Sequence, residues 1–116
     1  MRRDGYRADV YIAGPYTQGD VAQNVAVAMT VGNSLLSAGF AVYVPHLSHF
    51  LHMQRGRDYE EWIRHDLHWL FFCDAMLRLP GPSVGADREM AYAKECEMPI
   101  FHDVESLLTH FPERTS

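Results

Sequence analysis

Short apolar runs alternate along the chain with longer segments whose apolar residues recur every three or four positions. The short runs predict strands at residues 8–13, 40–44, 75–79 and 99–102, because each is brief and bounded by turn-forming residues. The longer segments predict helices at residues 20–37, 58–72, 85–96 and 104–110. Residues 46–57 show no clean period, so we expect a loop there with at most one helical turn.

This order of elements predicts an α/β fold, because strands that alternate with helices form right-handed βαβ units. At 116 residues the chain has the usual length of one domain. We therefore expect residues 1–116 to form a single three-layer sandwich of the flavodoxin or Rossmann type, with a mostly parallel sheet of four or five strands. Ligands bind such folds at the carboxyl ends of the strands, which places residues 14–19, 45–49 and 80–85 around one crevice.

Two carboxylates lie on the apolar side of their predicted helices. On a helical wheel Asp66 falls within about 60° of Tyr59 and Ile63, and Glu89 falls among alanines, whereas the other charged residues occupy the opposite sides. A buried carboxylate is costly unless it is paired, hydrogen-bonded or placed in a cleft, and desolvation raises its pKa toward the range that a general acid needs. We interpret both as candidate catalytic groups. The alternative is a pair of buried anchors that cap a loop or pair with Arg78.

Two predicted loops supply groups that suit an anion. Residues 14–20 join a strand to a helix start, where N–H groups and the helix dipole favour a phosphate. Residues 80–85 bring Ser83 and further N–H groups to another helix start. Neither loop is a Walker motif or a dinucleotide fingerprint, so the alternative of two glycine-rich turns without a ligand stays open.

Aromatic and histidine side chains gather near the predicted crevice. Tyr16, Tyr43, Trp62 and Trp69 have flat faces that stack on a base, although aromatic residues at such spacing more often belong to a core. The histidines within residues 46–52 and 65–68 do not have a recognised metal-ligand spacing. We therefore expect no metal site and no cofactor.

Composition argues against several partners. The net charge is -5 and lysines and arginines do not cluster, so we expect no nucleic-acid polymer as a partner. No apolar run approaches the ~18 residues of a membrane span, and we expect neither a signal peptide nor a membrane partner. Cys73 and Cys96 fit no disulfide or zinc spacing, and we expect two reduced, mostly buried thiols in a cytoplasmic protein.

Three segments resemble the nucleoside 2-deoxyribosyltransferase superfamily, which includes the 2'-deoxynucleoside 5'-monophosphate N-glycosidases. They are VYIAGPYT at residues 10–17, IRHDLHWLFFCD at residues 63–74 and PSVGADRE at residues 82–89. The similarity runs from about residue 8 to about residue 103. The Pro-Gly-Pro before Ser83 and the histidine-rich loop indicate a branch distinct from the known enzymes.

The resemblance implies cleavage of the N-glycosidic bond of a nucleoside or its 5'-monophosphate, by hydrolysis or by transfer of the sugar to another base. Glu89 would act as nucleophile or stabiliser at the anomeric carbon, and Asp66 would handle the proton on the leaving base. Together with the predicted crevice it gives the candidate substrate-binding residues, which are Gly14, Pro15, Tyr16, Thr17, Gly19, His46, Trp62, Ser83 and Gly85.

Expectations about ligand and assembly complete the sequence-based hypothesis. Because residues 14–19 open a helix and no lysine-rich site competes, we expect a 5'-phosphate to bind there. The family builds its pocket between subunits, so we expect a homodimer or larger closed assembly with Phe50, Leu51 and Met53 at the interface. Two other functions remain open: a non-catalytic module that binds a nucleotide or similar metabolite in the same crevice, and an enzyme acting on another N-glycoside.

Overall fold

The computed structural model describes residues 5–113 and confirms the predicted α/β fold. Within these residues one sheet of four parallel strands has the order β2-β1-β3-β4. The strands are β1 (Asp9–Ala13), β2 (Ala41–Tyr43), β3 (Ala75–Arg78) and β4 (Ile100–Phe101). All four lie inside the predicted strand segments.

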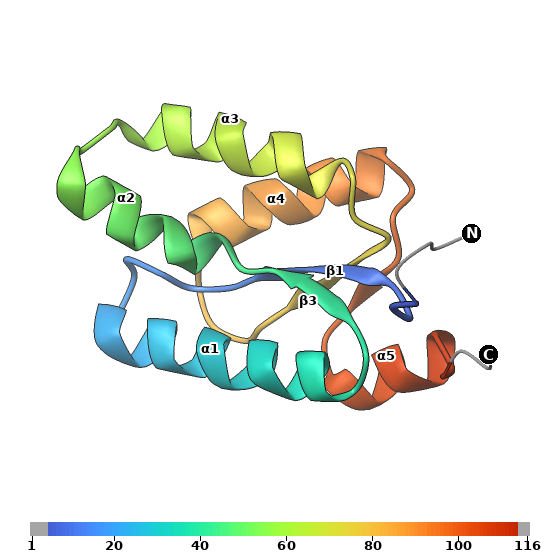
Figure 1. The fold of residues 1–116 in the computed structure, drawn as a ribbon. Coiled ribbons are helices and arrows are strands. Elements are labelled where there is room, and N and C mark those ends of the chain that lie inside the picture. Colours follow the sequence, from blue (N-terminus) through green and yellow to red (C-terminus); the bar gives the residue numbers. More distant parts are fainter. Residues whose placement is uncertain (1–4, 114–116) are drawn as a thin grey trace.

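Helices cover both faces of the sheet (Figure 1). Helices α1 (Val21–Ser37) and α5 (Val104–His110) lie on one face, and α3 (Tyr59–Leu70) and α4 (Val84–Glu95) lie on the other. Strand β1 alternates between the two cores, because Val10 and Ile12 pack on the side of α1 while Tyr11 and Ala13 pack on the side of α3 and α4. The predicted three-layer sandwich is therefore confirmed.

The segment predicted as a loop contains more helix than expected. A 3₁₀ turn, η1 (Pro45–Leu47), leads into the seven-residue helix α2 (Ser48–Gln54). None of the residues of α2 is buried. A helix without a buried stripe has no apolar period in its sequence, which explains why the pattern gave no helix there.

Side-chain caps fix where four of the helices begin. Asp20, Asp58, Ser83 and Asp103 each precede a helix and accept a hydrogen bond from the backbone N–H three residues later. Such caps satisfy N–H groups that have no partner inside the helix. They also explain why α1 and α3 start one residue after the predicted position.

Arg7 lies just before β1 begins and joins the C-terminal ends of two helices there. Its guanidinium donates to the carbonyl oxygens of Phe111 at 2.8 Å, Ala38 at 3.0 Å and Leu108 at 3.1 Å. It also lies 4.9 Å from the centre of the Phe40 ring. One side chain thus satisfies C-terminal carbonyl groups of both α1 and α5.

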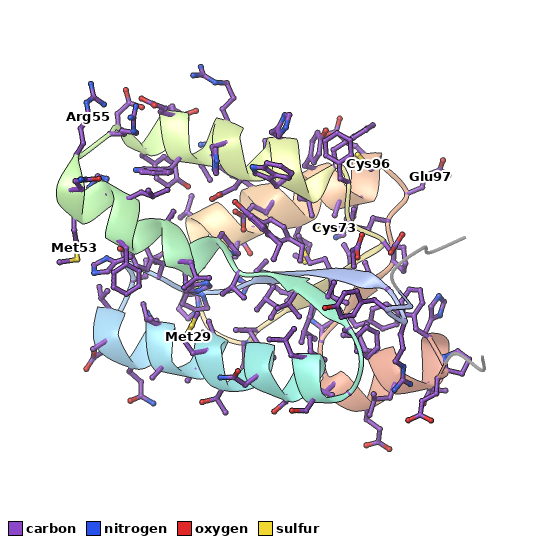
Figure 2. The ribbon with its side chains drawn as sticks, viewed as in Figure 1. Met29, Met53, Arg55, Cys73, Cys96 and Glu97 are labelled. Carbon is purple, nitrogen blue, oxygen red and sulfur yellow. The ribbon has the colours of Figure 1, made fainter. Side chains whose placement is uncertain are left out.

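The two cysteines differ in how far they are exposed. Cys96 lies at the end of α4 and is exposed, so the expectation that both thiols are mostly buried is wrong for this residue (Figure 2).

Among residues 5–113, no helix combines the length and the hydrophobicity that crossing a bilayer requires.

Candidate active site

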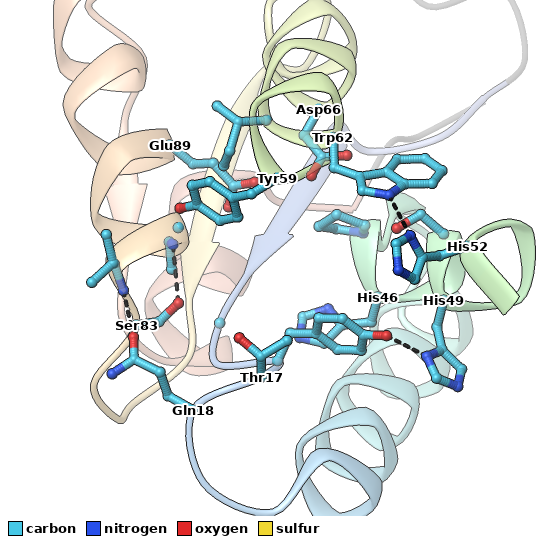
Figure 3. A pocket seen from close by; sticks show the side chains of 18 of the residues that line it. Thr17, Gln18, His46, His49, His52, Tyr59, Trp62, Asp66, Ser83 and Glu89 are labelled. Atoms are coloured by element: carbon cyan, nitrogen blue, oxygen red, sulfur yellow. Dashed lines mark hydrogen bonds between the residues drawn. The ribbon is translucent and has the colours of Figure 1, made fainter. Parts of the chain in front are cut away.

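A pocket lies at the carboxyl ends of the strands, where the chain leaves β1 and β3 in opposite directions across the sheet. This switch point is where open α/β sheets bind their ligands. The cavity has a volume of about 560 Å³, which is within the usual range for small-molecule sites. Its walls come from the loop after β1, from η1 and α2, and from the facing sides of α3 and α4 (Figure 3).

Glycines let the loops after β1 and β3 approach each other beneath the pocket. A Cβ on Gly14 would lie 2.9 Å from the Cβ of Leu79, and a Cβ on Gly81 would lie 2.9 Å from Cγ of Pro15. Gly81 also has a φ of 113°, which side-chain-bearing residues rarely adopt. Leu79 N–H donates to the Ala13 carbonyl at 2.7 Å. Gly14 and Pro15 therefore have a structural reason to be where they are, whatever they bind.

The structure brings the two predicted carboxylates into one pocket. Asp66 on α3 and Glu89 on α4 are 8% and 5% exposed, and both line the cavity. Glu89 Oε2 accepts a hydrogen bond of 2.7 Å from the hydroxyl of Tyr11. Both carboxyl groups lie on the same wall in Figure 3. Arg78 pairs instead with Asp87 at 3.1 Å, so neither carboxylate has the ion pair with Arg78 that the structural alternative suggested.

Burial shifts the pKa of both groups upward. Desolvation raises the pKa of Asp66 from 3.8 to about 8, and the charge of Glu89 and a hydrogen bond with Glu89 add to the shift. Desolvation also raises the pKa of Glu89, from 4.5 to about 7, although hydrogen bonds from Tyr11 and Asp66 and the charge of Arg78 oppose the rise. The larger upward shift at Asp66 favours Glu89 as the ionised member of the pair.

An unpartnered oxygen supports this assignment. Oδ1 of Asp66 is buried and, among the described residues, has no hydrogen-bond donor. Nδ1 of His65 lies 3.6 Å away, which is too far for a hydrogen bond. A neutral Asp66 avoids a buried, unsatisfied negative charge, and its proton can be shared with Glu89. These contacts favour a pair in which Asp66 keeps its proton and Glu89 is the ionised member.

Sequence reasoning missed Tyr11, the partner of Glu89. Tyr11 is fully buried in the middle of β1, and its ring stacks on Tyr43 with centroids 5.4 Å apart. Tyr43 in turn stacks on Trp69 at 6.2 Å. Neither Tyr43 nor Trp69 lines the pocket, so stacking on a base there is not supported for these two. Tyr43 packs against the core, as the alternative expected, whereas Trp69 is 46% exposed and does not belong to it. The available clue was a tyrosine in a strand buried on both faces, because its hydroxyl needs a partner there.

Histidines hold helix α2 against the rest of the pocket. The Tyr16 hydroxyl and Nδ1 of His49 form a short contact. Nδ1 of His52 accepts from the indole N–H of Trp62 at 2.9 Å and from the backbone N–H of Arg57 at 3.2 Å. The described residues contain no group of three or more His, Cys, Asp or Glu side chains that could hold a metal ion.

The chain's own side chains occupy part of both helix starts at the pocket. Ser83 Oγ accepts from Ala86 N–H at 3.1 Å, and Gln18 Oε1 accepts from Val84 N–H at 2.8 Å. At the start of α1 the carboxylate of Asp20 accepts from Gln23 N–H at 3.1 Å. Gln18 was missed in the sequence because glutamine in a loop has no distinctive pattern.

Seven of the nine predicted substrate-binding residues line the pocket: Gly14, Tyr16, Thr17, His46, Trp62, Ser83 and Gly85. Pro15 and Gly19 do not. Pro15 presents its carbonyl oxygen to Nε2 of His46 at 2.9 Å, and Gly19 occupies a turn with a φ of 88°. A Cβ on Gly85 would lie 3.2 Å from the Tyr59 hydroxyl, so this glycine admits the Tyr59 ring. The roles of all nine residues in substrate binding stay predictions.

Fold and pocket together define the class: a parallel α/β sandwich with two buried carboxyl groups at the switch point of its sheet. The chain belongs to the family described as Domain of unknown function (DUF4406), which matches residues 8–102. Its fold is similar to that of a solved 2-deoxyribosyltransferase from the psychrotolerant bacterium Bacillus psychrosaccharolyticus. That match has a TM-score of 0.60 and 20% identity, and it covers 80% of this chain and 69% of the other. No curated protein matches this chain.

Proposed function

We propose that this protein cleaves the N-glycosidic bond of a nucleoside or nucleoside 5'-monophosphate, by hydrolysis or by transfer of the sugar to another base. The observation that carries the proposal is the Asp66–Glu89 pair, two buried carboxyl groups of different acidity in one small-molecule pocket. Pairs of titratable groups whose surroundings separate their pKa values are typical of acid and nucleophile assignments. The similarity in fold to a 2-deoxyribosyltransferase is consistent with this chemistry.

In the first step an oxygen of Glu89 attacks the anomeric carbon of the sugar. The bond from that carbon to the base nitrogen breaks, its electron pair goes to the base, and the proton of Asp66 neutralises the departing base. In the second step water attacks the anomeric carbon, passes a proton to Asp66 and releases Glu89. A second base in place of water makes the reaction a transfer. The two carboxyl groups thus divide the work as in retaining glycosidases.

Tyr11 keeps Glu89 ready for attack. Its hydroxyl donates to Glu89 Oε2, which stabilises the ionised form against the cost of burial. We therefore assign Tyr11 as a positioning residue for the nucleophile.

The test is to incubate the protein with a panel of nucleosides and their 5'-monophosphates, with and without an acceptor base, and to separate the products. Free base without an acceptor identifies a hydrolase, and a new nucleoside formed only with an acceptor identifies a transferase. Binding of a panel member without any turnover would contradict the proposal and support a non-catalytic binding module.

A further inference from the structure

His46 has one ring nitrogen that the protein itself leaves without a partner. The side chain is 4% exposed and lines the pocket. Nε2 lies 2.9 Å from the carbonyl oxygen of Pro15, whereas the buried Nδ1 has no hydrogen-bond partner among the described residues. Buried polar atoms are nearly always hydrogen-bonded, so this nitrogen needs an explanation.

The contact with Pro15 fixes the chemical character of that nitrogen. A carbonyl oxygen only accepts, so Nε2 of His46 must carry the proton and donate it. In a neutral imidazole Nδ1 is then an acceptor with a lone pair. Burial lowers the pKa of His46, which favours this neutral form, although the bond to Pro15 acts in the opposite direction. His46 therefore holds, beside the pocket, an acceptor that lacks an O–H or N–H donor among the described residues.

The surroundings of His46 favour a hydroxyl over an anion. The carboxylate of Asp20 already occupies the start of α1, where the sequence placed a 5'-phosphate. Among the described residues that line the pocket, Arg57 has the single guanidinium, and it pairs with Glu61 at 2.7 Å. The phosphate expectation remains untested, but these charges weigh against it.

The position of His46 points to the sugar rather than the base. Figure 3 shows His46 and Thr17 across the pocket from Asp66 and Glu89. If Glu89 meets the anomeric carbon and Asp66 meets the base nitrogen, the groups that face the opposite wall are the hydroxyls of the sugar ring.

We propose that His46 is a specificity residue whose unprotonated Nδ1 accepts a hydrogen bond from a sugar hydroxyl of the substrate. The proposal rests on the proposed function, because it takes the sugar of an N-glycoside as the ligand. It adds the requirement that one hydroxyl be free, neither absent, methylated nor phosphorylated. A ligand without that hydroxyl leaves a buried acceptor unsatisfied and binds more weakly.

Two substitutions separate recognition from a structural role. His46→Asn places an amide oxygen near the position of Nδ1 and loses the donor to Pro15. His46→Gln places an amide N–H near the position of Nε2 and loses the acceptor. His68→Gln is the matched control, because His68 is exposed on α3 and does not line the pocket.

The experiment measures binding by calorimetry and KM and kcat for nucleosides that each lack one sugar hydroxyl. We expect the loss of one particular hydroxyl to weaken binding to the wild type, to His46→Asn and to His68→Gln by about tenfold, and to leave binding to His46→Gln nearly unchanged. The effect should appear in KM and in affinity.

Equal discrimination by the wild type and His46→Gln would overturn the proposal, and so would failure of the wild type to bind any nucleoside of the panel. If His46→Asn no longer distinguished the nucleosides that lack a hydroxyl, and His46→Gln still did, the role of His46 would be to hold Pro15 and the proposal would be overturned. Hydroxyl-dependent binding without cleavage would leave this proposal standing and refute the proposed function, so the two failures are distinguishable.

Discussion

At the residue scale, the bond from Tyr11 to Glu89 influences which carboxyl of the pair is ionised. The hydrogen bond lowers the pKa of Glu89 against the upward shift that burial causes. Activity requires an ionised Glu89 and a protonated Asp66, so the pH profile should have an acidic limb near 7 and a basic limb near 8.

Tyr11→Phe removes that hydrogen bond and keeps the ring. We expect the acidic limb of the pH profile to move to higher pH and the rate near neutral pH to fall by roughly 10- to 100-fold, the usual value of a hydrogen bond to a charged group. Tyr43→Phe is the control, since Tyr43 stacks on Tyr11 without donating to Glu89. Identical pH profiles for the wild type and Tyr11→Phe would contradict the positioning role.

The raised pKa of Asp66 also predicts how the stability of the protein depends on pH. Between pH 3.8 and about 8 the folded protein keeps the proton of Asp66, whereas the unfolded chain releases it. The contribution of Asp66 to the free energy of unfolding is therefore complete at low pH and is lost as the pH rises through that window. Asp66→Asn cannot ionise. We expect the variant to exceed the wild type in free energy of unfolding at pH 9 by on the order of 2–5 kcal/mol, with a much smaller difference at pH 4.

Urea unfolding across this pH range measures the effect. Glu95→Gln, at an exposed position on α4, should keep the pH dependence of the wild type. A constant difference between Asp66→Asn and the wild type at every pH would contradict a raised pKa of Asp66 in the folded protein.

Sequence reasoning found the two carboxylates because a helix has a fixed period, which makes a charge on the apolar side visible. It missed Tyr11 and Gln18 because their partners are 78 and 66 positions away along the chain. Contacts of that kind depend on tertiary packing, which no local pattern encodes.

At the scale of elements, Arg7 anchors α1 and α5 where β1 begins, at the opposite end of the strand from the pocket. Arg7→Ala leaves three carbonyl oxygens without their donor, and we expect a loss of about 2–4 kcal/mol in the free energy of unfolding. The activity of the folded protein should not change. Arg64→Ala, at an exposed position on α3, is the control. An unchanged urea midpoint for Arg7→Ala would contradict this role.

The contrast between local patterns and tertiary contacts also explains which elements could be predicted. Strands and helices with a buried stripe follow from the apolar pattern, and α1, α3, α4 and α5 all have buried residues. Helix α2 does not, and hydrogen bonds of His49 and His52 hold it to other elements. Its helical form therefore depends on contacts that become visible only in three dimensions.

At the scale of the whole molecule, α2 presents large apolar side chains to the surface. Phe50, Leu51 and Met53 are 64%, 58% and 68% exposed, and Met53 points away from the molecule in Figure 2. Clustered exposed apolar residues favour association, and we predict a homodimer or larger closed assembly through this helix.

Light scattering at micromolar concentration tests the assembly. We expect at least a dimer for the wild type and a monomer for the double variant Phe50→Ser, Met53→Ser. Val27→Ser, at an exposed position on α1, should leave the assembly intact. A monomeric wild type would contradict the prediction.

The central claim is that Glu89 and Asp66 act together in breaking an N-glycosidic bond. The most direct test measures the cleavage rate and melting temperature of Glu89→Ala and Asp66→Asn, on an ordinary nucleoside and on one with an activated leaving group. We predict that Glu89→Ala loses most activity on both substrates while the protein stays folded, because removal of a desolvated carboxyl group offsets the cost of leaving the Tyr11 hydroxyl without its partner. Asp66→Asn should lose about 10²–10⁴-fold on the ordinary substrate and far less on the activated one. Wild-type rates in Glu89→Ala would contradict the account.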